Sequence, residues 1–242
     1  MDKLVVVTGG SRGIGAATSK LLAAKGYRVV VNFMSNAKRA EQVVSDIRRD
    51  GGEAWSYQAN IASEDSVVSM FDYIYAEHGE IYGLVNNAGI LSTQCTLEQI
   101  TEERITQILA TNVTGTLLCT REATKYMNGG SIVNVSSRAS VTGSPFEYLD
   151  YAASKGAVDT LTRGLASELA SRKIRVNGVR PGLINTEMHA DGGEPERVKR
   201  LESLIPLGRG GEAEEVANAI AWLISEQASF VTGTFVDVSG GK

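Results

Sequence analysis

Segments typical of β-strands alternate with segments typical of α-helices along the whole chain of 242 residues. The strand-like segments are short and rich in β-branched residues, whereas the helix-like segments carry apolar residues at helical spacing. Strands are expected at residues 4–8, 28–33, 53–59, 83–86, 131–136, 174–180 and 234–238, and helices at 13–25, 37–50, 63–78, 101–126, 150–170 and 212–223. This order predicts a Rossmann-type doubly wound α/β fold, with a mostly parallel sheet of about seven strands and helices on both faces.

No linker, repeat or low-complexity stretch interrupts the alternation, so residues 1–242 are expected to form a single domain. The formal charge of −4, with acids and bases interspersed, argues against a nucleic-acid partner. No apolar run approaches the ~20 residues that cross a membrane, and the first residues read as a strand rather than a signal peptide. Cys95 and Cys119 are far apart and lack ligand spacing, so neither a disulfide framework nor a metal site is indicated. The cytoplasm is the expected location.

Two segments rich in glycine and proline, 138–149 and 185–211, do not fit the alternation. Loops of this length in a compact domain are usually functional. Both follow the carboxyl ends of predicted strands, where open α/β sheets bind ligands. Residues 185–211 are therefore expected to form a lid over a substrate.

Gly9 follows the first predicted strand, and Gly13 and Gly15 lie in the first turn of the first predicted helix. Glycines at this spacing allow a sharp turn, a close approach of backbone amides to a pyrophosphate, and tight packing of the helix on the sheet. Such a turn can also serve helix packing alone. Its place at the start of an alternating α/β chain favours a dinucleotide site.

The usual dinucleotide fingerprint has an acid at the end of the second strand, about 20 residues further on, that binds the ribose hydroxyls. This chain has Asn32, Phe33, Met34 and Ser35 there, without a carboxylate. A missing acid together with Arg12 in the glycine turn favours NADP(H), with NAD(H) possible. The alternative is that Arg12 is an exposed side chain of the turn and does not bind the cofactor.

Tyr151 and Lys155 lie four residues apart in a predicted helix, which places a phenol and an ammonium on one face. Such a pair can move a proton. Tyr148 has no lysine four residues on and is interpreted as a wall of the pocket.

With these motifs in place, the sequence resembles the short-chain dehydrogenase/reductase family nearly from end to end. The matching segments occur in family order: the glycine turn 8–15, the Asn-Asn-Ala-Gly segment 86–89, Asn112, Ser136-Ser137, 151–155, 181–186 and 233–241. The resemblance implies NAD(P)-dependent reduction of a small-molecule carbonyl, or oxidation of an alcohol, and usually a homotetramer. It is nearest to bacterial members labelled 3-oxoacyl reductase or glucose dehydrogenase.

By this resemblance four residues are assigned to catalysis. Tyr151 is the acid/base, and Lys155 lowers its pKa and anchors the ribose. Ser137, rather than Ser136 or Ser140, hydrogen-bonds the carbonyl oxygen, and Asn112 holds a water that links Lys155 to solvent. A free phenol has a pKa of about 10, and lowering it by ~2–3 units takes about 3–4 kcal/mol, which Lys155 and an oxidised nicotinamide ring are expected to supply.

The resemblance also assigns cofactor and substrate contacts. The expected cofactor-binding residues are Gly9, Ser11, Arg12, Gly13, Ile14, Gly15, Asn32, Ser35, Asn60, Ile61, Asn86, Ala88, Gly89, Tyr151, Lys155, Pro181, Gly182, Ile184 and Thr186. The expected substrate-pocket residues are Thr93, Gln94, Tyr148, Met188 and His189.

The chain departs from the family pattern in places. Residues 137–151 are one residue longer than in many relatives, and Asn60 stands where an aspartate commonly faces the adenine. Carrier-protein reductases use two arginines for docking; Arg172 matches one, and the other falls near Gly129. A sugar dehydrogenase and a 3-oxoacyl thioester reductase are therefore both kept as alternatives, as is a non-catalytic NADP(H)-binding sensor.

The tetramer interfaces are expected on helices 101–126 and 150–170, and on helix 212–223 with the last strand. Val216, Ile220 and Leu223 would be buried either between subunits or in the core of one chain.

Overall fold

The computed structural model describes residues 3–242, whose seven strands form one sheet in the order β3-β2-β1-β4-β5-β6-β7. The strands are β1 Leu4–Val7, β2 Arg28–Phe33, β3 Ala54–Gln58, β4 Ile81–Asn86, β5 Gly130–Val135, β6 Ile174–Pro181 and β7 Phe235–Val238. Every pair of neighbours is parallel, so the predicted fold class is confirmed and the sheet is wholly rather than mostly parallel. The strand order reverses between β1 and β4, which is where such sheets bind ligands.

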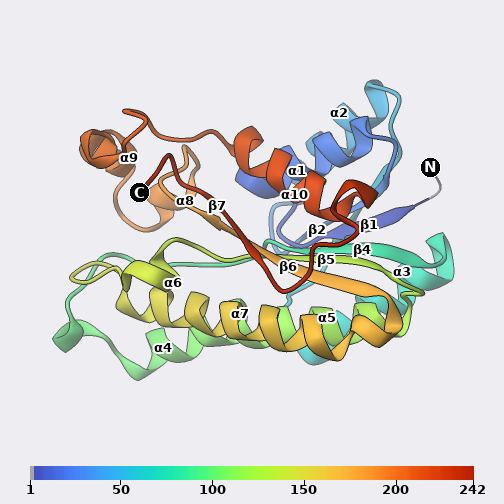
Figure 1. The fold of residues 1–242 in the computed structure, drawn as a ribbon, viewed down its shortest axis with the longest axis horizontal. Coiled ribbons are helices and arrows are strands. Elements are labelled where there is room, and N and C mark those ends of the chain that lie inside the picture. The colour runs from blue at the N-terminus through green and yellow to red at the C-terminus, as the bar shows by residue number, and fades with distance from the viewer. Residues whose placement is uncertain (1–2) are drawn as a thin grey trace.

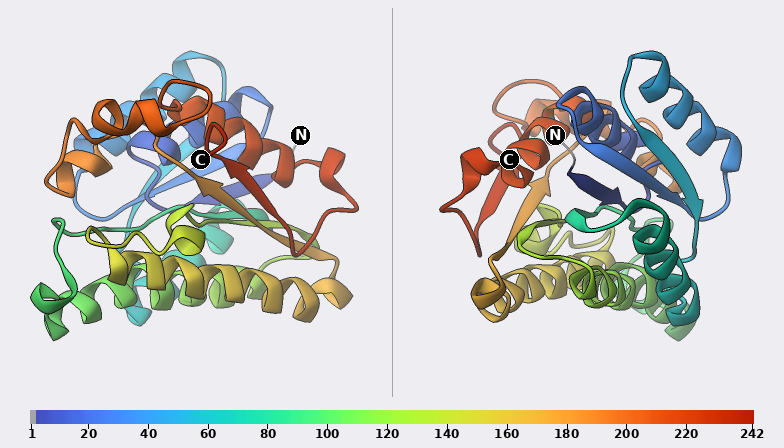
Figure 2. Two further views of the ribbon diagram at one scale, coloured as in Figure 1. Left: turned by 60° about the vertical axis from the view of Figure 1, so that its left-hand side comes forward. Right: turned by 90° about the vertical axis from the view of Figure 1, so that its right-hand side faces the viewer.

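Helices cover both faces of the sheet (Figure 1). One layer contains α1 Gly13–Ala24, α2 Ala37–Arg49 and α10 Ala213–Ile224, and the other contains α3 Glu64–His78, α4 Glu102–Leu109, α5 Thr116–Lys125 and α7 Leu149–Glu168. Figure 2 shows the sheet between these two layers from the side. Among residues 3–242, no helix is both long and apolar enough to cross a bilayer.

Each strand contributes side chains to two apolar layers, because successive residues of a strand point to opposite faces. In β1, Val5 and Val7 pack with α1, α2 and α10, whereas Leu4 and Val6 pack with α3 and α5. The alternative left open for helix 212–223 is thereby settled. Val216, Ile220 and Leu223 are fully buried in the core of the single chain.

The single helix expected over residues 101–126 is interrupted by a π-helical turn, Ala110–Gly115, between α4 and α5. Two contacts with distant segments account for it. The Asn112 amide binds the backbone of Ile90, and a Cβ on Gly115 would lie only 2.8 Å from Ile61 Cδ1. Such π-bulges within helices are frequent at functional sites.

The two loop segments are more ordered than expected. Residues 138–149 contain α6 Ala139–Thr142, and residues 185–211 contain α8 Met188–Asp191 and α9 Arg197–Leu201. The latter form an arm at the carboxyl ends of the strands (upper left in Figure 1). Single 3-10 turns lie at Leu97–Gln99, Ala170–Arg172, Glu202–Leu204 and Glu226–Ala228.

Candidate active site

Two cavities adjoin at the carboxyl ends of the strands. The larger, of about 440 Å³, is lined by the glycine turn, the end of β2 and the start of the 185–211 arm. The smaller, of about 180 Å³, is lined by the end of β5, the start of α7 and the same arm. Ile14, Asn87, Thr186 and Met188 line both, so the two cavities form one continuous trough.

The glycine turn forms a tight cradle under the larger cavity. Gly9 and Gly13 adopt φ angles of +61° and +49°, which side chains disfavour. A Cβ on Gly15 would lie 2.3 Å from the carbonyl oxygen of Gly9, so the turn closes only with glycine there. Asn87 fastens the turn by donating to the carbonyl oxygens of Thr8 and Gly9, each at 3.0 Å. The start of α1 thus lies against the cavity, a geometry suited to a pyrophosphate.

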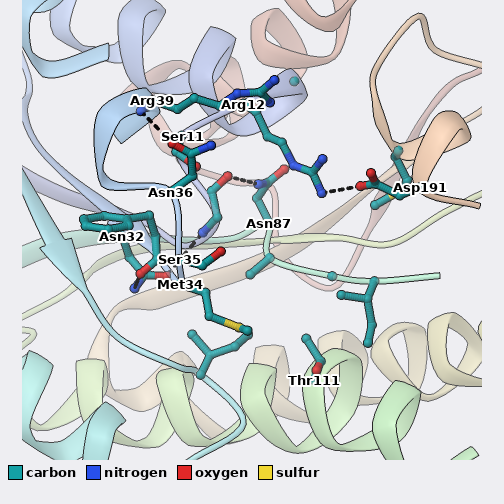
Figure 3. Close-up of a pocket in the computed structure, with 18 of the residues that line it drawn as sticks. Ser11, Arg12, Asn32, Met34, Ser35, Asn36, Arg39, Asn87, Thr111 and Asp191 are labelled. Atoms are coloured by element: carbon teal, nitrogen blue, oxygen red, sulfur yellow. Dashed lines mark hydrogen bonds and ion pairs between the residues drawn. The ribbon is translucent and has the colours of Figure 1, made fainter. Parts of the chain in front are cut away.

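Two arginines stand on the lining of the larger cavity, and both are paired with carboxylates of the 185–211 arm. Arg12 Nη2 lies 2.5 Å from an Asp191 carboxylate oxygen, and Arg39 Nη1 lies 3.2 Å from one of Glu187. Figure 3 shows the Arg12 side chain directed toward Asp191. All four side chains are about half exposed, so these ion pairs are weak. Arg39 was not predicted, although it lies in the first turn of the helix that follows β2.

Asn32 lines the larger cavity, but its side-chain amide forms hydrogen bonds with the protein backbone. Its Oδ1 accepts from the backbone amide of Gly9 at 3.3 Å, and its Nδ2 donates to the carbonyl of Ala59 at 3.1 Å. The side chain is 2% exposed. Asn32 therefore ties the glycine turn to β3, and the next residues, Phe33 to Asn36, offer their side chains to the cavity.

The remaining predicted cofactor residues fall into three groups, and all of them lie in the described chain. Those that line the larger cavity are Gly9, Ser11, Arg12, Gly13, Ile14, Ser35, Asn60, Ile61, Ala88, Gly89 and Thr186. Those that line the smaller cavity are Tyr151, Lys155, Pro181, Gly182 and Ile184. Gly15 and Asn86 line neither.

The positions of Gly15 and Asn86 have clear causes. Gly15 lies behind the glycine turn and permits its packing. Asn86 Nδ2 donates to Thr120 and Asn134 below the sheet, and the neighbouring Asn87 lines both cavities instead.

Tyr151, Lys155 and Ser137 meet in the wall of the smaller cavity. Lys155 Nζ lies 5.7 Å from the centre of the Tyr151 ring and donates to the carbonyl of Val135 at 2.7 Å. The competing serines are occupied elsewhere: Ser136 donates to Asp159 at 2.6 Å and Ser140 to the carbonyl of Ser137 at 2.7 Å. The assignment of Ser137 stays a prediction.

The pKa values of both Tyr151 and Lys155 are shifted by burial in the structure. Burial raises the pKa of Tyr151 to about 12, and a hydrogen bond with Ser137 and the charge of Arg197 only partly oppose it. Burial likewise lowers the pKa of Lys155 to about 8, against a smaller opposing effect of Asp159. Without a bound cofactor, desolvation of the phenol outweighs the neighbouring charge, so the expected lowering of the Tyr151 pKa by Lys155 and an oxidised nicotinamide ring stays a prediction for the complex.

Asn112 lines neither cavity and is fully buried in the π-helical turn. Its Oδ1 accepts from the amide of Ile90 at 2.8 Å, and its Nδ2 donates to the Ile90 carbonyl and to Ser154. A Cβ on Gly89 would lie 3.3 Å from Asn112 Oδ1 and 3.4 Å from Lys155 Nζ. Asn112 thus fixes the segment after β4 beside Lys155.

Of the predicted substrate-pocket residues, Tyr148, Met188 and His189 line the smaller cavity. Thr93 and Gln94, both in the described chain, do not; Gln94 donates to Glu194 at 2.5 Å, and a Cβ on Gly193 would lie 2.9 Å from Thr93. These two residues hold the 185–211 arm in place. Arg197 lines the cavity as well and was not predicted, because nothing in the sequence distinguishes it from its exposed neighbours.

Several known proteins are similar to this chain. A family model described as "Enoyl-(Acyl carrier protein) reductase" matches residues 9–242. An uncharacterized oxidoreductase of Escherichia coli, YgfF, is 58% identical over 99% of both chains. The 3-oxoacyl-(acyl-carrier-protein) reductase FabG of Staphylococcus aureus is 38% identical, over 100% of this chain and 98% of its own.

Two solved structures share the fold of this chain closely. A short-chain dehydrogenase/reductase from Serratia marcescens has a TM-score of 0.92 at 35% identity, covering 99% of this chain and 97% of its own. A short chain dehydrogenase from Burkholderia cenocepacia, solved in complex with NADP, has a TM-score of 0.92 at 34% identity, covering 100% of this chain and 98% of its own.

Proposed function

Because the chain belongs to the short-chain dehydrogenase/reductase family, we propose that it reduces a ketone or aldehyde to the alcohol with NADPH, using Tyr151 as the proton donor. Membership makes the protein an oxidoreductase that binds a nicotinamide cofactor. One observation carries the finer assignment. Tyr151, Ser137 and Lys155 share the wall of a cavity that opens into the cradle of the glycine turn.

The chain's own groups would act on the carbonyl oxygen. When bound, the cofactor supplies a hydride to the carbonyl carbon. Tyr151 donates its phenolic proton to the oxygen as charge develops there, and Ser137 donates a hydrogen bond to the same atom. A Tyr151 pKa of about 12 suits this direction, since the phenol stays protonated at neutral pH.

Lys155 would replace the lost proton. Its pKa of about 8 leaves it mostly charged at pH 7 yet able to give up a proton. With one N–H held by the Val135 carbonyl, two remain for a ribose hydroxyl and for a water at the turn that holds Asn112.

We further propose that NADPH is preferred over NADH. Arg12 and Arg39 line the larger cavity, and residues 32–36 contain no carboxylate. In the structure the two arginines form only weak, half-exposed ion pairs with Asp191 and Glu187. A 2′-phosphate, with its higher charge, would bind both guanidinium groups better than single carboxylates do. A hydrogen bond to a charged group contributes roughly 1.5–3 kcal/mol, which is about tenfold or more in affinity.

The test is kcat/KM for both cofactors with one fixed diketone. Arg12→Ala and Arg39→Ala should each lower the value for NADPH by roughly tenfold and leave NADH unchanged. Ser35→Asp should do the same by repulsion. Position 35 is chosen over position 32, because a carboxylate at position 32 would face the Ala59 carbonyl. Arg49→Ala, an exposed site on the same helix as Arg39, is the control. Equal values for NADPH and NADH in the unmodified protein would refute the preference.

A small carbonyl compound is a better candidate than a carrier-protein thioester. Of the two expected docking arginines, Arg172 is turned to the Thr124 carbonyl at the end of α5, and the other position is Gly129. NADPH binding without turnover of any ketone, aldehyde, sugar or thioester would instead support a sensor.

A further inference from the structure

Two residues in the wall of the smaller cavity each carry a buried polar atom that the proposed chemistry does not use. Within residues 3–242, Arg197 Nη1 and His189 Nδ1 are both buried and have no hydrogen-bond partner. Both residues line the cavity that holds Tyr151. Buried polar groups are nearly always paired in folded proteins, so two unpartnered atoms on residues of one cavity wall point to a ligand group that satisfies them.

The His189 ring presents an acceptor. Its Nε2 lies 2.9 Å from the carbonyl oxygen of Ile184, which can only accept, so Nε2 carries the hydrogen. Burial and the nearby charge of Arg197 lower the His189 pKa, which keeps the ring neutral at pH 7. Nδ1 of a neutral ring protonated at Nε2 has a free lone pair.

Arg197 presents a donor held in a fixed place. Its Nη2 lies 2.5 Å from a Glu147 oxygen, and its guanidinium stacks 4.7 Å from the centre of the Tyr148 ring. Its Nη1 lies 3.7 Å from Glu194, beyond hydrogen-bond distance.

The charge of Arg197 is already balanced. Arg200 binds the same two carboxylates, at 3.0 Å from Glu147 and 2.8 Å from Glu194. Two arginines and two glutamates therefore form a neutral network, which calls for a neutral group rather than an anion opposite Nη1.

A hydroxyl group satisfies one donor and one acceptor at once, because its oxygen accepts from Arg197 Nη1 while its hydrogen is donated to His189 Nδ1. We propose that the substrate is a hydroxy-ketone or hydroxy-aldehyde, whose carbonyl faces Tyr151 and whose hydroxyl is bound by Arg197 and His189. A carboxylate at this place would face the lone pair of Nδ1, and an alkyl group would leave both atoms unpaired. The inference rests on the proposed carbonyl reduction and narrows its substrate class.

The test compares 1-hydroxy-2-butanone, 2-butanone and 2-oxobutanoate as substrates with NADPH. Sites built to hydrogen-bond a hydroxyl strongly reject analogues that lack it, so kcat/KM should favour the hydroxy-ketone over both others by at least about tenfold. His189→Leu and Arg197→Met should each lower this ratio about tenfold, mainly by reducing the value for the hydroxy-ketone. Arg200→Met is the matched control and should keep the ratio, since it binds the same glutamates without lining the cavity.

A binding measurement separates this inference from the proposed function. Calorimetry on the NADPH-loaded protein should show tighter binding of 1,2-butanediol than of 2-butanol, and His189→Leu should remove the difference. Equal kcat/KM for hydroxy-ketone and ketone, or equal binding of diol and alcohol, would overturn the hydroxyl site while leaving carbonyl reduction in place. Selective binding of the diol without turnover of any carbonyl would uphold the hydroxyl site and overturn the proposed function.

Discussion

Replacing Lys155 with methionine should stabilise the protein while removing its activity. Lys155 is 4% exposed, and burial holds its pKa at about 8 instead of the ordinary 10.5. Each pKa unit is worth 1.36 kcal/mol, so burying the charged amine costs about 3 kcal/mol at pH 7. The hydrogen bond from Lys155 to the Val135 carbonyl returns about 1 kcal/mol. Lys155→Met should therefore raise the free energy of unfolding by about 2 kcal/mol at pH 7.

The gain should depend on pH in a defined direction. Between pH 8 and 10.5 the folded chain has lost the Lys155 proton while the unfolded chain retains it, so the stability of the unmodified protein rises with pH. The advantage of methionine should thus nearly vanish by about pH 10. Tyrosines that titrate in this range are common to both proteins and cancel in the difference.

Urea unfolding of both proteins at pH 7 and pH 10 measures this effect, and Lys38→Met, at an exposed position of α2, should change stability by less than about 0.5 kcal/mol. Activity should fall at least about 100-fold in Lys155→Met if the amine serves catalysis. A variant that is less stable at pH 7, or whose gain is the same at both pH values, would refute the reasoning.

Two further predictions concern the cofactor cavity and the assembly. Asp191→Asn should tighten NADPH binding several-fold in a fluorescence titration, because the Asp191 carboxylate competes with the 2′-phosphate for Arg12; unchanged affinity would show that Arg12 does not meet the phosphate. The chain should sediment as a homotetramer at micromolar concentration, because Ile105, Leu109, Leu117 and Leu149 stay 39–44% exposed on α4, α5 and α7 and Trp222 and Phe230 stay exposed near α10; a monomer would contradict this.

The fold followed from the sequence because its signals are local. Strand and helix periodicity and the glycine turn depend on neighbouring residues, and they placed the strands and the cradle correctly. The interruption of helix 101–126 was not predicted, because it is caused by residues far away in the chain. Asn112 binds the Ile90 backbone, and Gly115 packs closely against Ile61. The helical pattern on either side of the interruption continues almost unchanged.

Site residues could be predicted from the sequence where their role follows from a motif. They could not be predicted where the role depends on the direction of a side chain or on how deeply it is buried. Successive residues of a strand point to opposite faces, and no motif shows that the Asn32 amide binds the backbone of Gly9 and Ala59 instead of a cofactor. Arg39 and Arg197 became candidates only when folding brought them to the cavities. The pKa of Tyr151 depends on its desolvation, which no local pattern reports.

Proton donation by Tyr151 is the central claim, and one pair of variants tests it most directly. Tyr148 lies three residues earlier in the wall of the same cavity, where its hydroxyl donates to the Gly192 carbonyl at 3.3 Å. Steady-state reduction of a ketone with saturating NADPH should fall at least about 100-fold in Tyr151→Phe and retain most of its rate in Tyr148→Phe. NADPH affinity should stay within about twofold in both, since each ring still packs. Substantial turnover by Tyr151→Phe, or its loss in Tyr148→Phe alone, would contradict the account.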